Sequence, residues 1–212
     1  MDDLSPALRA SWDDAWRALR ASPQPGLLAE LLARYSEPHR AYHTLQHLGE
    51  CAVELERAAN LAERLAEVEL ALWFHDAIYD TRAHDNEARS GGWARTALVG
   101  AGVAMETAAR VEALVLATRH DGPPDGVDAR LLVDVDLSIL GAPPARFAEY
   151  ERQIREEYAW VPEPEFRRRR ARVLGGFLAR PAIYGTAAFV ERLEARARTN
   201  LARSLAELTP PG

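Results

Sequence analysis

The sequence predicts an all-α protein. Apolar residues recur at the three- and four-residue spacing of amphipathic helices through nearly all of the 212 residues. No segment maintains the alternation of apolar and polar residues that a half-buried strand requires. Clusters of Pro and Gly lie between the periodic segments, where they end helices. Together these observations favour helices packed around a common core and joined by short connections.

Six helices are predicted in the first part of the chain. The first follows the pair Ser5-Pro6, a favourable cap and first turn, and repeats Leu8, Trp12 and Trp16 at helical spacing. The segment 22–26, with two Pro residues and one Gly, ends this helix. The other five helices are expected over residues 27–35, 44–60, 63–78, 85–100 and 103–118.

The rest of the chain continues the same pattern. A polar turn at residues 120–126 and a break at 141–144 interrupt the helical periodicity. Helices are expected over residues 129–140, from the break to 158, and over 162–180 and 187–208. No repeat or linker divides the chain, so residues 26–212 are expected to form one domain and residues 1–25 an N-terminal helical appendage.

Charge and cysteine content restrict the classes of function. The 26 basic residues, all of them Arg, and the 32 acidic residues give a net charge of −6, which argues against an extended nucleic-acid-binding surface. The single Cys51 excludes an internal disulfide and fits a reducing compartment. The acidic N-terminus lacks an apolar signal core, and no apolar run reaches membrane-spanning length. We therefore expect a soluble cytoplasmic protein without a membrane partner.

The adjacent residues His75 and Asp76 interrupt an otherwise apolar segment at residues 71–80. Burying such groups is costly unless something binds them, and a metal ion accepts both imidazole nitrogen and carboxylate oxygen. Two other stretches place the same ligand types among apolar residues; they contain His43 and His47, and Asp134 and Asp136. Spacing alone leaves an alternative, a helical scaffold in which these groups form buried hydrogen bonds.

A zinc-protease interpretation of His43 and His47 can be excluded. Two His residues four apart share one helix face, as in the His-Glu-x-x-His motif. The second position of that motif must be Glu, the general base, and here it is Thr44.

The order of several motifs is specific. They are Tyr42-His43-Thr44-x-x-His47, Phe74-His75-Asp76-Ala77-Ile78-Tyr79-Asp80, Asp85-Asn86-Glu87-x-x-Ser90, Asp134-x-Asp136-Leu137-x-Ile139-Leu140-Gly141, Ile154-Arg155-x-Glu157-Tyr158, Arg170-x-x-Val173-Leu174 and Ala197-Arg198-x-Asn200-Leu201. In this order they resemble the HD-domain superfamily, and more narrowly its small bacterial branch of predicted metal-dependent phosphohydrolases. The resemblance covers roughly residues 34–201 and implies a single HD-domain-like helical bundle.

The resemblance also implies one bound divalent transition metal ion, with Mn, Co, Ni, Fe or Zn as candidates and Mg as a further one. The implied ligands are His47, His75, Asp76 and Asp136. His47 is preferred to His43 because the superfamily's first ligand precedes an apolar residue, here Leu48. Asp136 is preferred to Asp134 because the last Asp usually precedes a Leu or a basic residue. In each case the neighbour stays open as the alternative ligand.

A mononuclear site is favoured over a dinuclear one. Two-metal HD proteins need two further His residues between the His-Asp pair and the final Asp. Only His84 and His120 lie in that interval, and His84 falls in a polar loop.

Asp80 is the expected catalytic carboxylate, beside Asp76. It occupies the place of the second acid in the His-Asp-x-x-Glu-Asp form of HD enzymes that act on guanosine tetraphosphate. Tyr79 replaces the first acid, so the mechanism of that subgroup cannot be carried over intact. The alternative is that Asp80 only anchors the following loop. The residues expected to contact substrate are His43, Arg82, Glu87, Arg119 and His120, and Arg40 is a further candidate for a phosphate contact.

The function implied by the resemblance is hydrolysis of a phosphate ester or anhydride, in a nucleotide or another small phosphorylated molecule, through a metal-activated water. The alternative is a non-catalytic HD module that binds metal and nucleotide as a sensor or docking unit. The complete set of four ligands favours catalysis, because a sensor need not keep an open metal position. No motif in the sequence is typical of binding to a base or a sugar, so the identity of the substrate is not predicted. A homodimer is the default expectation for the oligomeric state.

Overall fold

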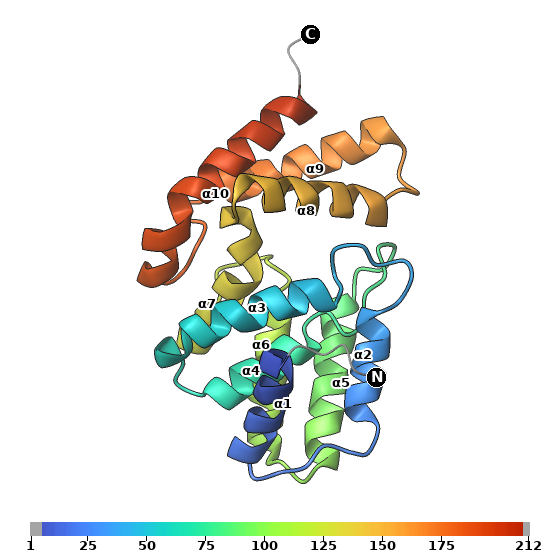
Figure 1. Cartoon of the computed structure of the whole chain (residues 1–212), viewed down its shortest axis with the longest axis vertical. Coiled ribbons are helices and arrows are strands. Elements are labelled where there is room, and N and C mark those ends of the chain that lie inside the picture. Colours follow the sequence, from blue (N-terminus) through green and yellow to red (C-terminus); the bar gives the residue numbers. More distant parts are fainter. Residues whose placement is uncertain (1–5, 210–212) are drawn as a thin grey trace. The chain divides into compact units, whose positions relative to one another are not determined.

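The structure, a computed structural model, describes residues 6–209 of the chain. Within this range it contains ten α-helices and two short 3-10 helices, with 70% of residues helical and no strand (Figure 1). The prediction of an all-α protein is confirmed.

The helices follow one another through short connections. In chain order they are α1 (Pro6–Ala18), α2 (Leu27–Tyr35), α3 (Leu45–Arg57), the 3-10 helix η1 (Ala59–Leu61), α4 (Leu65–Phe74), α5 (Asn86–Gly100), α6 (Met105–Ala117), α7 (Val127–Asp136), the 3-10 helix η2 (Leu137–Gly141), α8 (Pro144–Glu157), α9 (Glu163–Leu178) and α10 (Ala187–Leu208). Most predicted boundaries agree with these. The helix predicted over 63–78 is shorter, because α4 ends at Phe74, and the helix predicted over 129–140 changes from α to 3-10 geometry after Asp136.

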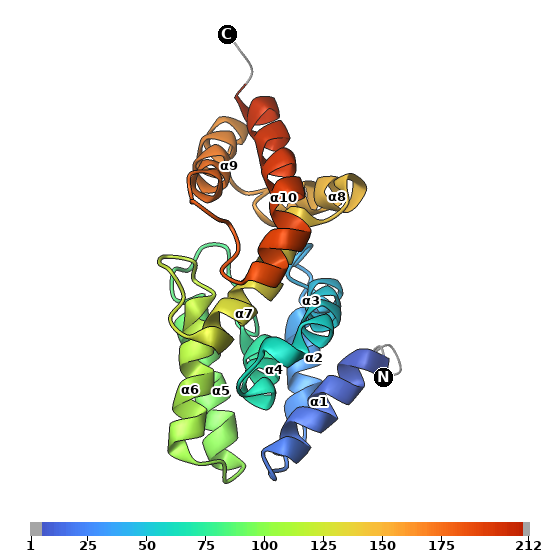
Figure 2. The same cartoon turned by 90° about the vertical axis from the view of Figure 1, so that its left-hand side faces the viewer.

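The chain divides into two compact units, Met1–Val135 and Asp136–Gly212. In the first unit α4 is the central helix, and α1, α3, α5 and α6 pack against it (Figure 2). Every residue from Leu70 to Phe74 has at most 1% of its surface exposed. A helix that is apolar on all sides can be stable only when other helices enclose it. The chain therefore leaves the end of α4 in the interior of the first unit, and His75, the next residue, is buried there.

The helix of the predicted appendage, α1, packs against α3 and α4. The Trp12 and Trp73 rings meet edge to face with centroids 5.1 Å apart, and both side chains are buried. The described part of the segment before residue 26 thus contributes to the core of the first unit. The division into residues 1–25 and 26–212 stays a prediction.

In the second unit η2 packs against α8 and α10. Gly141 allows a close approach, since a Cβ atom at this position would lie 2.7 Å from Leu193 Cβ and 2.9 Å from the Tyr184 hydroxyl. The Asn200 side-chain amide donates to the carbonyl oxygens of Leu140 and Ala142, both at 2.9 Å. Gly141 and Asn200, which belong to the motifs quoted above, thus hold the turn that follows α7.

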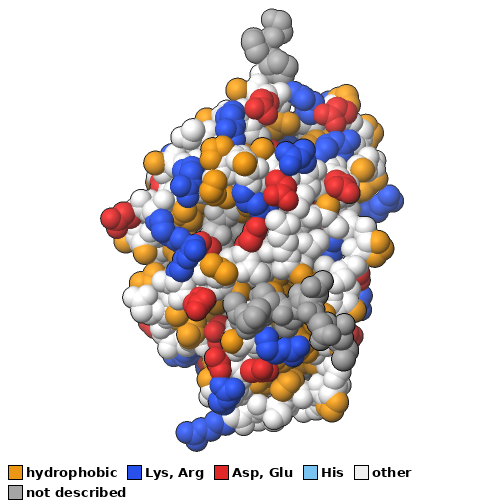
Figure 3. Space-filling model, viewed as in Figure 1, with side chains coloured by type: hydrophobic (Ala, Val, Ile, Leu, Met, Phe, Trp, Pro, Cys, Tyr) orange, Lys and Arg blue, Asp and Glu red, His pale blue; other side chains and the backbone are white. Residues whose placement is uncertain are grey.

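Among the described residues, none of the helices combines the length and the apolar character needed to cross a membrane. On the face shown in Figure 3, Arg side chains lie interspersed with Asp and Glu side chains. This mixture agrees with the small net charge of −6.

Candidate metal centre

His47 reaches the interior from the first turn of α3. Thr44 caps this helix, because its side-chain oxygen accepts a hydrogen bond from the backbone N–H of Gln46 at 3.3 Å. The buried face of α3 comprises His47, Leu48, Cys51, Ala52 and Leu55, at helical spacing. The same amphipathic pattern that packs α3 therefore buries the imidazole of His47, which is 1% exposed.

His75 follows the last residue of α4 and is also 1% exposed. Its ring atom Nδ1 lies 2.7 Å from the carbonyl oxygen of Leu72. A carbonyl oxygen can only accept, so Nδ1 carries a proton that it donates to Leu72. In the neutral ring Nε2 then presents a lone pair, as in metal-binding histidines whose other nitrogen is held by a carbonyl group.

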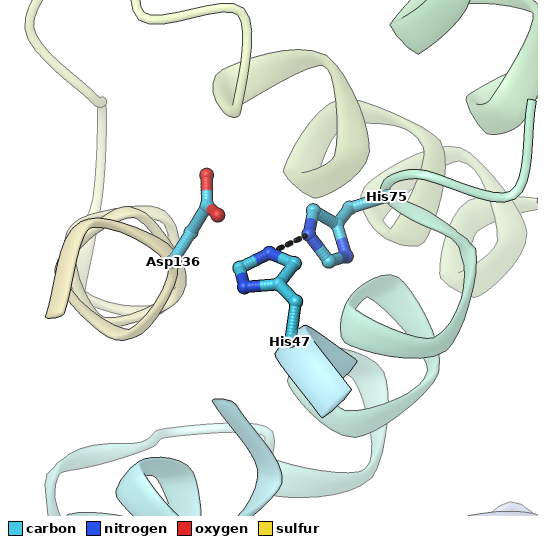
Figure 4. A group of neighbouring side chains, drawn as sticks. All are labelled: His47, His75 and Asp136. Atoms are coloured by element: carbon cyan, nitrogen blue, oxygen red, sulfur yellow. Dashed lines mark hydrogen bonds between the residues drawn. The ribbon is translucent and has the colours of Figure 1, made fainter. Parts of the chain in front are cut away.

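Asp136 is the last residue of α7, and its half-buried side chain joins the two imidazoles. One ligand atom each from His47, His75 and Asp136 lies within 4.8 Å of the other two. Figure 4 shows the three side chains pointing toward one another, His47 from α3, Asp136 from the end of α7 and His75 from the turn after α4. Asp134, the alternative, is fully buried and lies two residues earlier, about 200° around the helix from Asp136.

Asp76 adds a second carboxylate to the two imidazoles. Its Oδ2 atom lies 2.9 Å from Nε2 of His75 and 3.6 Å from Nε2 of His47. Burial by itself would raise the pKa of Asp76. When both ring nitrogens of His75 carry a proton, its charge and its Nε2–H bond to Asp76, together with attraction to His43, lower this pKa well below its ordinary value. The carboxyl group is therefore ionised and acts only as an acceptor.

The donor set fits a cation. Nε2 of His47 and Nε2 of His75 are 3.2 Å apart, and Oδ2 of Asp76 lies beside both. The space between these two nitrogens can hold a proton, in a hydrogen bond between the two rings, or a metal ion. Two ligands about 2.1 Å from one metal ion are about 3.0–3.4 Å apart in octahedral or tetrahedral geometry, close to the separations observed. Two imidazole nitrogens with carboxylate oxygens suit a first-row divalent transition metal.

Cys51 contacts the Nδ1 atom of His47, a contact that the sequence did not indicate. Its Sγ atom lies 3.5 Å from Nδ1 of His47 and 3.8 Å from the carbonyl oxygen of Val135. The thiol can donate to that carbonyl while Sγ accepts from Nδ1–H, which leaves Nε2 of His47 to face the cluster. The only sequence signal was the four-residue spacing from His47, which places Cys51 one turn further along α3.

Arg40 was a candidate for contact with a phosphate group, and its position in the structure contradicts that prediction. Its side chain is fully buried and donates to the backbone carbonyls of His43, Asp76 and Ala77. The guanidinium is therefore engaged inside the protein.

His43, a predicted substrate contact, lies close to the cluster. Its ring stacks on Tyr79 with centroids 4.1 Å apart, and it meets the His47 ring at 5.9 Å. Electrostatic attraction between His43 and Asp76 contributes to the low pKa of the carboxyl group. His43 thus lies beside the candidate ligands, and His47 is the member of this pair that belongs to the cluster.

Asp80 is exposed, and its Oδ1 atom accepts a hydrogen bond from the backbone N–H of Arg82 at 2.9 Å. The Asn86 side chain accepts from the backbone N–H of Asp80 at 3.1 Å and donates to its carbonyl oxygen at 3.0 Å. Ser90 Oγ accepts from the backbone N–H of Ile78 at 3.0 Å. Asn86 and Ser90, two residues of the third motif, thereby fasten the loop after α4 to α5.

The other predicted substrate contacts lie in nearby connections. Arg82 is exposed in the loop before α5, and Glu87 is half-buried in the first turn of that helix. Arg119 is exposed after α6, and its Nε atom donates to Oδ2 of Asp121 at 3.0 Å. That hydrogen bond raises the pKa of the Arg119 guanidinium, and the charge of Glu87 makes a smaller contribution in the same direction. His120 has a left-handed backbone conformation, with φ of 57°. The roles of these residues stay predictions.

Comparison of the chain with protein-family models, curated proteins and solved structures gave no match.

Proposed function

We propose that this protein is a metal-dependent phosphohydrolase of the HD type. It would cleave a phosphate ester or anhydride in a nucleotide or another small phosphorylated molecule. The observation that carries the proposal is the convergence of His47, His75 and Asp136 within 4.8 Å, with the carboxyl group of Asp76 beside both imidazoles. The ordered motifs of the sequence supply the reaction class.

The residues of the cluster are prepared to hold a divalent cation. His75 is oriented by its bond to Leu72, and His47 has Cys51 at its Nδ1 atom. When bound, the cation supplies Lewis acidity, which lowers the pKa of water and neutralises charge on a phosphoryl oxygen. The ionised carboxylate of Asp76 balances the positive charge.

Asp80 is the proposed proton acceptor. An ionised carboxylate has about four lone-pair sites, so the hydrogen bond from the Arg82 N–H leaves acceptor capacity for a water molecule. His43, half-buried against Tyr79 and close enough to Asp76 to attract its carboxylate, is a proposed substrate contact. Arg82 and Arg119 are the proposed cationic partners of phosphate.

Two observations favour a second candidate, a non-catalytic module that binds metal and nucleotide. The carboxylate of Asp80 already holds its own loop, and Arg40 is committed to backbone carbonyls. A sensor would keep the metal ligands and need neither group for turnover. For either function we propose a cytoplasmic location, because Cys51, the one cysteine of the chain, is buried as a free thiol beside His47.

Metal content and phosphate release, measured together, test the proposal. Protein stripped with a chelator is reloaded with Mn, Co, Ni, Fe, Zn or Mg and assayed against nucleotides and small phosphate esters. We expect His75→Ala and Asp76→Ala each to lose both metal and activity while helicity by circular dichroism is kept. His84→Ala, in an exposed loop, is the matched control and should retain both.

The outcomes separate the candidates. Metal-dependent phosphate release that disappears in Asp76→Ala supports the hydrolase. Stoichiometric metal without release from any substrate supports the binding module. Undiminished metal in both His75→Ala and Asp76→Ala would contradict the metal centre itself.

A further inference from the structure

One buried cation, Arg40, lies between the two segments that deliver His47 and His75. It stands in the connection between α2 and α3, and its side chain is fully buried. Burying a guanidinium is costly unless each of its donors finds an acceptor. The Arg40 side chain donates four hydrogen bonds and forms an ion pair with Glu37.

The acceptors come from two parts of the chain. NH1 donates to the carbonyl oxygens of His43 at 3.1 Å and of Asp76 at 2.6 Å. NH2 lies 3.2 Å from the carbonyl oxygen of Ala77 and 3.1 Å from the Glu37 carboxylate, to which Nε also donates at 3.1 Å. These contacts and its full burial direct the guanidinium toward the protein interior.

Aromatic rings hold the guanidinium from its sides. The ring of Tyr35 lies 5.3 Å and the ring of Tyr79 lies 5.4 Å from the Cζ atom of Arg40. Tyr35 also donates its hydroxyl to the carbonyl oxygen of Trp73 at 3.2 Å, in the last turn of α4. The planar fork of Arg suits this site in a way that a Lys ammonium does not.

The position of Asp76 needs such support because α4 has ended before it. Residues 75–78 form turns and bends, and no regular helical hydrogen bond fixes the backbone of Asp76. The bond from Arg40 to the Asp76 carbonyl supplies an anchor in its place. The bond to the His43 carbonyl connects the same guanidinium to the residue before Thr44, the cap of the helix that carries His47.

We infer that Arg40 is a positioning residue of the proposed metal centre. It fixes the backbone of Asp76 relative to the start of α3, so that the Asp76 carboxylate meets the imidazoles of His47 and His75. The inference rests on the proposed metal binding. It gives Arg40 a part in the site without contact to the metal or the substrate.

Cobalt titration of the full chain tests the inference, because visible absorption of Co²⁺ reports both affinity and coordination. Outer residues that orient ligands typically change metal affinity by about 10- to 100-fold when they are replaced. We expect Arg40→Gln to weaken Co²⁺ binding by about that factor and to change the absorption bands of the bound ion. Helicity and a urea transition are measured alongside to show that the variant is folded.

Arg34→Gln is the matched control. Arg34 belongs to α2, is half-exposed and forms an ion pair with the same Glu37 at 3.1 Å. Unlike Arg40, it is not bonded to the Asp76 carbonyl. This variant should keep the affinity and the bands of the wild type. Arg40→Lys keeps the charge but loses the fork, so we expect it to fold and to bind Co²⁺ with reduced affinity.

Wild-type affinity and unchanged bands in folded Arg40→Gln would overturn the inference, even if its stability were lower. Should Arg40→Gln not fold, the same result in Arg40→Lys would overturn it. Failure of the wild type itself to bind Co²⁺ would instead refute the metal centre, and the inference with it.

Discussion

Glu69 provides a test of the structure that does not depend on the metal. It is half-buried on α4, on the side facing Asp14 of α1. Burial, and then repulsion by Asp14, raises the pKa of Glu69 to about 7 from its ordinary value of 4.5. The perturbation is Glu69→Gln, which replaces the carboxyl group by a neutral group of the same shape.

The direction of the pH dependence of stability follows from the pH at which Glu69 loses its proton in the folded and in the unfolded chain. Below pH 4.5 Glu69 is neutral in both states and adds no penalty. Between pH 4.5 and about 7 the unfolded chain loses the proton first, so the free energy of unfolding falls; above pH 7 the penalty is constant. At about 1.4 kcal/mol per pKa unit the full shift corresponds to about 3 kcal/mol. Solvent screening of a half-exposed group reduces this to about 1–2 kcal/mol.

Urea unfolding at pH 5 and at pH 8.5, in the presence of a chelator, measures the effect. Glu69→Gln should be more stable than the wild type by about 1–2 kcal/mol at pH 8.5, or about 2–8 °C in Tm, and the gain should shrink at pH 5. Asp14→Asn, which removes only the smaller cause, should gain less. An equal effect of Glu69→Gln at both pH values would refute this account of α1 packed against α4.

Three further substitutions probe the loop after α4, the turn after α7 and the proposed base. Ser90→Ala leaves the Ile78 N–H without its acceptor and should lower the free energy of unfolding by about 1–3 kcal/mol in urea melts, whereas an unchanged midpoint would show that water replaces the hydroxyl. Gly141→Ala brings a Cβ to 2.7 Å from Leu193 Cβ and should destabilise by about 1–3 kcal/mol in thermal melts, with a neutral effect counting against the close packing of η2 on α10. Asp80→Asn should keep the metal and lose phosphate release; full turnover in this variant would leave Asp80 only its loop-anchoring hydrogen bond.

Periodicity and local end signals were sufficient for the fold class and for most helix boundaries. α2 occupies the predicted residues 27–35, because Gly26 before it and a polar turn after it mark its ends locally. The end of α4 was misplaced because a carbonyl of its last turn bonds to a side chain from elsewhere, and such a partner leaves no local pattern. The hydroxyl of Tyr35 bonds to the Trp73 carbonyl across 38 residues of sequence.

In the candidate site, too, local patterns identified some residues, while contacts between distant residues could not be predicted. His75 and Asp76 were visible in the sequence because polar groups inside an apolar run are unusual. Arg40 was misjudged as a phosphate contact, since only the folded chain brings its guanidinium to carbonyls 36 and 37 residues away. Cys51 was used in the sequence only as evidence on disulfides and compartment, because its contacts with His47 and with the Val135 carbonyl form only when α3 and α7 come together.

The enclosed character of α4 has a consequence in the unfolded chain. The run from Leu70 to Phe74 then becomes accessible, and a short apolar segment without charge is prone to intermolecular β pairing. Glu67 and Glu69 precede this run and Asp76 follows it closely, so charge flanks both ends and opposes aggregation. Asp76→Ala would leave His75 as the one polar residue between this run and Ala77-Ile78. Asp76→Asn, which keeps a polar group there, is therefore the better choice for any experiment that passes through the unfolded state.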